Sequence, residues 1–167
     1  ISDTKDNLTI NKIDHQPYIL HNKSSSLELY AGIGVGVVTK NGLKPPRNHP
    51  AINPTPLKAL DNIFKNCKTN KTIYASISVT NGQHLAKQTA NEKVGIFGGI
   101  SILGTTGFVK PISATAYINS IAQELNYAKA NNYTNIIFTL GNTAYKKALT
   151  FNGNNYIIEI GNFIYDG

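Results

Sequence analysis

The stretch that most constrains this fold runs from Val94 to Gly107 and reads VGIFGGISILGTTG. Its apolar side chains are typical of a buried strand. Glycine inside such a strand marks a bulge, or a close approach by another backbone or a ligand. Its exit, Gly104–Gly107, adds free N–H groups and two threonine hydroxyls. Close packing and a ligand-binding edge both remain open, and the spacing matches no standard nucleotide motif.

The segments before this stretch predict a β-rich region with one helix. Weak strand patterns occupy residues 8–13 and 17–21, and residues 27–40 alternate glycine with branched apolar residues, which predicts a closely packed strand. Residues 43–56 hold five prolines, so we predict a rigid loop that is a candidate ligand wall. Thr55 is the expected N-cap of the following helix, with Cys67 on its buried side.

The remaining patterns alternate between strand and helix. A half-buried strand is predicted at residues 73–79, and a short helical segment follows the Asn81-Gly82 turn. Residues 114–131 predict an amphipathic helix. The predicted strands at 135–140 and 156–160 flank a helix at 142–149, an order that favours parallel βαβ units.

The expected fold is therefore mixed α and β, in two lobes. Residues 1–90 form a β-rich lobe with one helix and the proline-rich loop. Residues 91–167 form an α/β lobe with a largely parallel sheet flanked by helices. Three predicted strands end in glycine with Asn or Thr, at 104–107, 141–142 and 161–162. Ligands of open parallel sheets bind outside such ends, although glycine is also common there simply because it ends a strand and allows the turn into a helix.

Charge and composition restrict the partners. The net charge of +7 comes from fifteen lysines and one arginine. Such a charge favours anionic partners, but the lysines are scattered, and arginine, which reads phosphate and guanine, is nearly absent. Nucleic acid is therefore poorly supported. The apolar runs are too short to span a bilayer, and the single cysteine favours a reducing, cytoplasmic setting.

Five stretches together resemble one known family. They read GVGVVTK, HPAINPTP, ISVTNGQHLAKQT, VGIFGGISILGTTGFVKPIS and GNF, and they begin at residues 34, 49, 77, 94 and 161. In order and spacing they resemble CbiD, the cobalt-precorrin-5B C(1)-methyltransferases of anaerobic cobalamin biosynthesis. The resemblance covers residue 29 to the C-terminus. Family members are longer, and this chain has no methionine, so we expect a central fragment that is weakly active or inactive alone.

The resemblance implies a methyl transfer from S-adenosylmethionine to carbon 1 of cobalt-precorrin-5B, a cobalt tetrapyrrole that carries several carboxylates. We also expect no nucleic-acid partner, no membrane partner and no metal site of the protein's own. The sequence identifies neither a catalytic residue nor an oligomeric state. The main alternative is a non-catalytic basic α/β module that binds a ligand. A basic nucleic-acid-binding protein is a weaker one.

The candidate residues follow from the glycine-rich segments and the resemblance. Those expected to bind the methyl donor are Gly98, Gly99, Ser101, Gly104, Thr105, Thr106, Gly107, Gly141, Asn142, Gly161 and Asn162. Those expected to bind the tetrapyrrole are Gly34, Gly36, Thr39, Lys40, Asn53 and Lys110. Lys44 and Arg47 are further candidates for its carboxylates, although each of these cations fits an ordinary solvated surface equally well.

Overall fold

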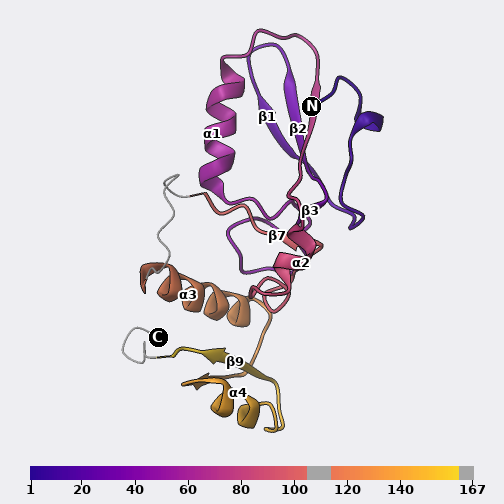
Figure 1. Cartoon of the computed structure of the whole chain (residues 1–167). Coiled ribbons are helices and arrows are strands. Elements are labelled where there is room, and N and C mark those ends of the chain that lie inside the picture. The colour runs from indigo at the N-terminus through magenta and orange to yellow at the C-terminus, as the bar shows by residue number, and fades with distance from the viewer. Residues whose placement is uncertain (105–113, 162–167) are drawn as a thin grey trace. The chain divides into compact units, whose positions relative to one another are not determined.

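The computed structural model describes residues 1–104 and 114–161 (Figure 1). The chain divides into two compact units, Ile1–Lys40 with Lys44–Phe108, and Asn41–Leu43 with Val109–Gly167. The expected division at residue 90 lies inside the first unit. The difference arises because part of the central glycine-rich stretch pairs with strands near residue 35.

A three-stranded sheet carries the main core of the first unit. Its order is β1 (Tyr18–His21), β2 (Ser26–Ala31) and β5 (Ile73–Ile77), with β1 antiparallel and β5 parallel to β2. Helix α1 (Pro54–Lys65) turns its apolar stripe to this sheet. The core cluster consists of Leu29, Ile52 and Ala75, and the half-buried side chains of Tyr18, Leu27, Leu57, Leu60, Ile77 and Ile102 pack against it.

The glycine-rich segments form very short strands. Strand β3 (Gly34–Val35) pairs in parallel with β7 (Gly99–Ile100), and β4 (Val37–Val38) pairs antiparallel with β6 (Ile96–Phe97). Gly98, at a φ of +82°, separates β6 from β7 in the left-handed region that favours glycine. Glycine thus interrupts the stretch as predicted, but the burial is only partial: Ile96 is buried, whereas Phe97 and Leu103 are exposed. The short helix α2 (Gly82–Ala86) lies near β3 and β7.

The second unit is built on one parallel strand pair. Helix α3 (Ala114–Ala130) precedes β8 (Asn135–Thr139), helix α4 (Asn142–Ala148) and β9 (Asn155–Glu159). Strands β8 and β9 run parallel over five register pairs, so the predicted βαβ unit is confirmed. The order of strands and helices across the described residues gives the mixed α and β class that the sequence predicts.

Three local expectations are wrong. Residues 8–13 form no strand, and a 3₁₀ turn at Lys5–Asn7 precedes them. Helix α1 begins at Pro54 with Asn53 as its N-cap, rather than at Pro56 after Thr55, because Pro54 also suits the first helical turn. Cys67 is exposed, because α1 ends at Lys65 and leaves it outside the apolar stripe. No helix in the described ranges is long and apolar enough to cross a membrane.

Candidate functional site

Three backbone segments meet at Gly34, Gly82 and Gly99, which we call the glycine junction. Gly34 and Gly99 are register partners in the β3–β7 pair. A Cβ on Gly99 would overlap the carbonyl group of Gly34, and one on Gly82 would lie 2.8 Å from the Gly34 Cα. Real Cβ atoms do not approach other backbone so closely, so all three positions require glycine. Close packing therefore accounts for Gly34 and Gly99.

A buried asparagine supports the same junction. The Asn11 amide nitrogen donates to the Val35 carbonyl at 2.7 Å and to the Gly98 carbonyl at 3.2 Å. Its amide oxygen accepts the Ile13 N–H at 3.0 Å. Sequence reasoning missed Asn11, because residues 8–13 carry only a weak strand pattern and the partner carbonyls are far away along the chain.

Two predicted polar site residues are engaged with the backbone or a neighbouring side chain. The Thr39 hydroxyl donates to the Gly95 carbonyl at 2.9 Å. The Ser101 hydroxyl lies 3.3 Å from the Asn91 amide oxygen, and the Asn91 amide nitrogen donates to the Gly99 carbonyl at 3.1 Å. These bonds hold the segment around β6 and β7, so the structure gives Thr39 and Ser101 a structural role.

A small pocket of about 260 Å³ opens beside the glycine junction. Its lining residues come from two of the motifs singled out in the sequence; they are Ile33, Gly34, Val79, Asn81, Gly82, Gln83 and His84. Asn81 adopts a left-handed φ of +57° before α2. The side chains of Gln83 and His84 are exposed. The Asn81-Gly82 turn signal marks this place in the sequence, although we expected only a turn there.

The start of α1 brings two further candidates together. The backbone N–H of Asn53, the N-cap of α1, donates to the Ile102 carbonyl at 2.9 Å. The position of a Gly104 Cβ would lie 3.5 Å from the Pro56 ring, an ordinary contact. The proline-rich loop thus lies beside the end of the central stretch. On its other side, the Tyr18 hydroxyl donates to the Pro50 carbonyl at 3.3 Å.

In the second unit, two predicted glycines lie at one edge of the β8–β9 pair. Thr139 of β8 pairs with Glu159 of β9, and each glycine comes two positions after its strand's member of that pair. Gly141 has a φ of +148°, and a Cβ there would meet no described atom within 4 Å. Its conformation, rather than crowding, requires glycine, which leaves the backbone accessible. Asn142, the first residue of α4, is exposed.

The three glycine endings do not end successive strands of one sheet, because β7 pairs with β3 whereas β8 pairs with β9. Among the cationic candidates, Lys40, Lys44 and Arg47 are exposed. Gly36, between β3 and β4, has no room for a side chain, since a Cβ there would lie 2.8 Å from the Gly99 carbonyl oxygen. The other candidates lie outside the described residues; they are Thr105, Thr106, Gly107, Lys110 and Asn162. Within the described ranges, no group of three or more His, Cys, Asp or Glu side chains could hold a metal ion.

Comparison with known proteins identifies the family. Residues 3–111 match the CbiD family, a range that includes the whole glycine junction. The chain belongs to the CbiD family. It is similar to the cobalt-precorrin-5B C(1)-methyltransferase of Methanococcus maripaludis strain C7, with 46% identity over 84% of this chain and 39% of the relative. The protein of that name from Methanocaldococcus jannaschii is 47% identical over 79% of this chain and 37% of the relative.

A solved structure of a CbiD protein is also similar. It is the crystal structure of the cobalamin biosynthesis protein from Archaeoglobus fulgidus, with 31% sequence identity and a TM-score of 0.39. The similarity covers 89% of this chain and 47% of that one. The chain spans less than half the length of the two methyltransferases named above.

Proposed function

We propose that this chain takes part in the methylation of cobalt-precorrin-5B at carbon 1, with S-adenosylmethionine as the methyl donor, in the cytoplasm. The observation that carries the proposal is its membership of the CbiD family, together with the activity for which its relatives are named. The cytoplasmic setting rests on the single, exposed cysteine, which cannot form an internal disulfide.

Methyl transfer depends mainly on how the enzyme positions the tetrapyrrole carbon relative to the methyl donor. A tetrapyrrole carbon attacks the donor's methyl carbon, and the sulfonium sulfur keeps the bonding electron pair and leaves as a thioether. Such a displacement depends on in-line placement of nucleophile and donor more than on an acid or a base. A site built from backbone edges and a few polar side chains suits it, and the described residues offer edges of this kind at Gly104 and Gly141.

For the donor, we favour the edge at Gly141, Asn142 and Gly161. Packing requires the glycines of the junction, whereas the backbone at Gly141 meets no described atom at its Cβ position. The carboxyl end of a parallel strand pair is also where ligands of open α/β sheets bind. For the tetrapyrrole carboxylates, the exposed cations Lys40, Lys44 and Arg47 are suitable partners.

Titration with S-adenosylhomocysteine, followed by the backbone amide NMR signals, tests this assignment. We expect shifts at Gly141, Asn142 and Gly161. In Asn142→Ala the dissociation constant should rise about fivefold, the loss of roughly one hydrogen bond. The matched control is Asn152→Ala, an exposed asparagine in the loop before β9. Shifts confined to residues 1–60 would overturn the donor site, and binding without methyl transfer in any fuller form of the enzyme would favour the non-catalytic alternative.

A further inference from the structure

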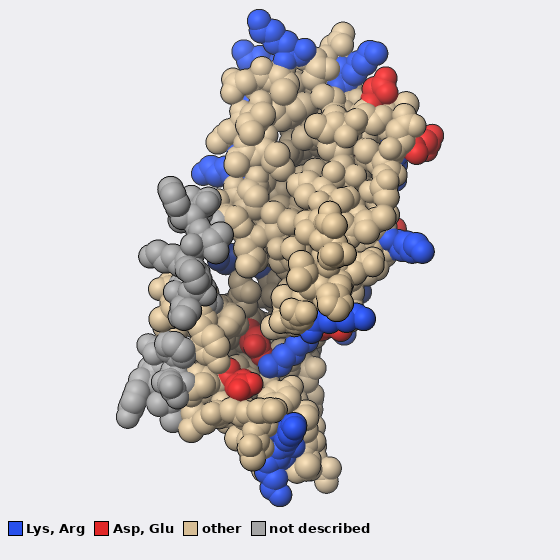
Figure 2. Space-filling model, viewed as in Figure 1, with Lys and Arg blue, Asp and Glu red and all other residues tan. Residues whose placement is uncertain are grey.

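A wide groove lies at the far end of α1, away from the glycine-rich segments. Its volume is about 690 Å³, larger than that of the pocket beside the glycine junction. It lies between the β1–β2 turn and the segment that leads from α1 to β5, and is lined by Asn22, Lys23, Ser24, Lys65, Asn66, Cys67, Lys68, Thr69 and Asn70. Of these residues, three are lysines and none is acidic. Figure 2 shows basic side chains gathered over this end of the first unit.

The wall of the groove is held by hydrogen bonds. The Asn22 side chain joins its two sides, since its amide nitrogen donates to the Cys67 carbonyl at 3.1 Å. The Asn22 amide oxygen accepts the backbone N–H groups of Ser24 and Ser25 at 2.8 and 2.7 Å. The turn that carries Lys23 is thus joined to the segment that carries Lys68, which keeps the backbone positions of the two lysines on the two sides of the groove.

The lysines of the groove are not needed to satisfy the carbonyls at the C-terminal end of α1. A helix C-terminus attracts cations through its exposed carbonyls, which is the ordinary reason for lysines there. Here other donors occupy those carbonyls. Asn66 donates from its side chain to Asn62 and from its backbone to Ile63, and the Cys67 N–H donates to Phe64. Of the three groove lysines, only Lys65 forms a salt bridge within the part of the chain that the structure describes, with its ammonium 2.6 Å from the Asp61 carboxylate.

We infer that this groove, which we call the lysine groove, binds a small molecule that carries two or more oxyanion groups. Lys23 and Lys68 would supply the main charge, and the Ser24 and Thr69 hydroxyls would supply hydrogen bonds. Lysine recognises carboxylate and phosphate alike as a point charge, so a polycarboxylate and a polyphosphate share the chemistry that the groove offers. The inference does not rest on the proposed methyl transfer.

NMR titrations at constant ionic strength test it, with citrate as the polycarboxylate, pyrophosphate as the polyphosphate and acetate as the monovalent reference. We expect citrate or pyrophosphate to shift the amides of residues 22–24 and 65–70 and to bind at least about tenfold more tightly than acetate. The anion that binds more tightly shows whether the natural ligand is a polycarboxylate or a polyphosphate. Equal binding of all three anions, or shifts elsewhere, would overturn the inference.

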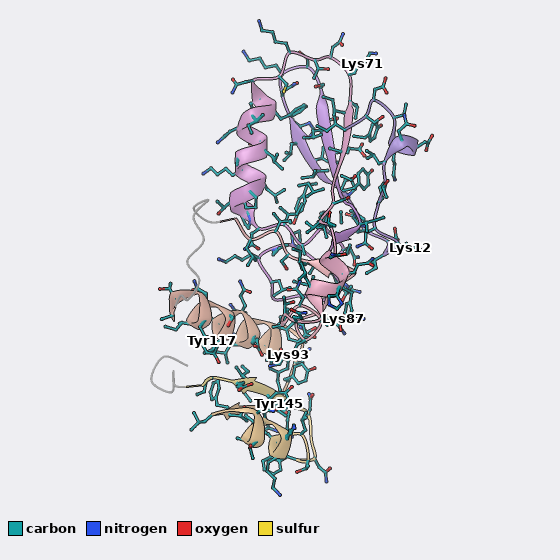
Figure 3. All side chains as sticks on the ribbon, viewed as in Figure 1. Lys12, Lys71, Lys87, Lys93, Tyr117 and Tyr145 are labelled. Atoms are coloured by element: carbon teal, nitrogen blue, oxygen red, sulfur yellow. The ribbon has the colours of Figure 1, made fainter. Side chains whose placement is uncertain are left out.

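Two double variants that lose the same net charge distinguish binding in the groove from the general attraction of anions to a basic protein. The double variant Lys23→Gln, Lys68→Gln should raise the dissociation constant about tenfold, because it removes two exposed charge contacts. The control Lys12→Gln, Lys87→Gln lowers the net charge equally, and both lysines lie far from Lys71 at the groove end of the unit (Figure 3). An equal loss of affinity in the two variants would overturn the inference. So would a groove variant with lower thermal stability and unchanged affinity, since its lysines would then only stabilise the helix end.

Discussion

Gly34 and Gly99 face each other in the parallel pair of β3 and β7, where neither residue has room for a side chain. A Cβ on Gly99 would lie 2.6 Å from the Val35 nitrogen, and would overlap the Gly34 carbonyl. Gly34 itself adopts a φ of +81°, which L side chains rarely adopt. Gly99 is therefore glycine because of Gly34, whereas Gly34 is glycine because of its own φ and because a Cβ there would overlap the Val79 carbonyl oxygen.

The first prediction concerns this contact. Gly99→Ala should destabilise the protein by about 2–3 kcal/mol, because the new methyl group forces β7 away from β3. The control is Gly104→Ala in the same unit, where the Cβ meets only the Pro56 ring at 3.5 Å and the cost is that of a φ of +39°. We expect about 1 kcal/mol there. Urea unfolding measures both, and equal losses in the two variants would contradict the packing argument.

The second prediction concerns Asn11. Asn11→Ala leaves the carbonyls of Val35 and Gly98 without their amide donor, so we expect a loss of about 2–3 kcal/mol in the free energy of unfolding. Asn7→Ala is the control, since the hydrogen bonds of Asn7 are exposed, and it should cost under about 0.5 kcal/mol.

Asn11→Asp provides a second test of the same geometry. A carboxylate would face two carbonyl oxygens, so the variant should be less stable than wild type at neutral pH and recover part of the loss on acidification, as the carboxyl gains a proton and a donor. A variant whose deficit is independent of pH would show that the side chain does not face these carbonyls.

Much of the fold follows from local patterns. The spacing of the apolar residues predicts α3, and short apolar runs predict β8 and β9, although Ile136 and Phe138 of β8 remain exposed. The interruption of the central stretch follows from Gly98, where a positive φ ends one strand and begins the next. Proline position alone is less decisive: Pro54 and Pro56 both suit a first helical turn, and the structure begins α1 at the earlier one.

The site depends on long-range pairing, which local patterns do not contain. Nothing near Gly99 in the sequence indicates that Gly34 and Gly82 are its neighbours, or that Asn11 donates to the adjoining carbonyl. The identity of these residues shows only that backbone must approach backbone somewhere. For the same reason, the sequence pattern led us to expect Gly104, Gly141 and Gly161 at the ends of neighbouring strands. In the described sheets β7 pairs with β3, and not with β8 or β9.

The third prediction concerns His15, which bonds through both ring nitrogens. Its Nδ1 lies 2.7 Å from the Ile13 carbonyl, and its Nε2 lies 3.0 Å from the Ala31 nitrogen. An N–H must donate to the carbonyl, so Nδ1 carries the proton and Nε2 accepts the Ala31 N–H. His15→Ala should cost about 1–3 kcal/mol, because the buried Ala31 N–H loses its acceptor. The exposed His21 provides the control, and His21→Ala should unfold at the wild-type urea concentration.

The last prediction is a dependence on alkaline pH that is due to Tyr18. Burial raises the pKa of its hydroxyl from 10.0 to about 12. The hydroxyl also shares its one proton between the Pro50 and Ile52 carbonyls at 3.3 and 3.4 Å, a hydrogen bond that the phenolate cannot donate. Because the folded pKa is the higher one, the folded state holds the proton after the unfolded state has lost it. Stability is therefore fully present below pH 10 and falls as the pH rises towards 12.

Tyr18→Phe isolates this contribution from the other groups that titrate in the same range. The variant should be less stable than wild type by about 1 kcal/mol at pH 9, since it lacks this shared hydrogen bond. Between pH 9 and pH 11 it should lose about 1 kcal/mol less than wild type, because one tyrosine no longer ionises on unfolding. Urea unfolding at both pH values gives the comparison. If the two proteins lost the same stability over this interval, the Tyr18 hydroxyl would not be held in the folded state as the proline-rich loop places it.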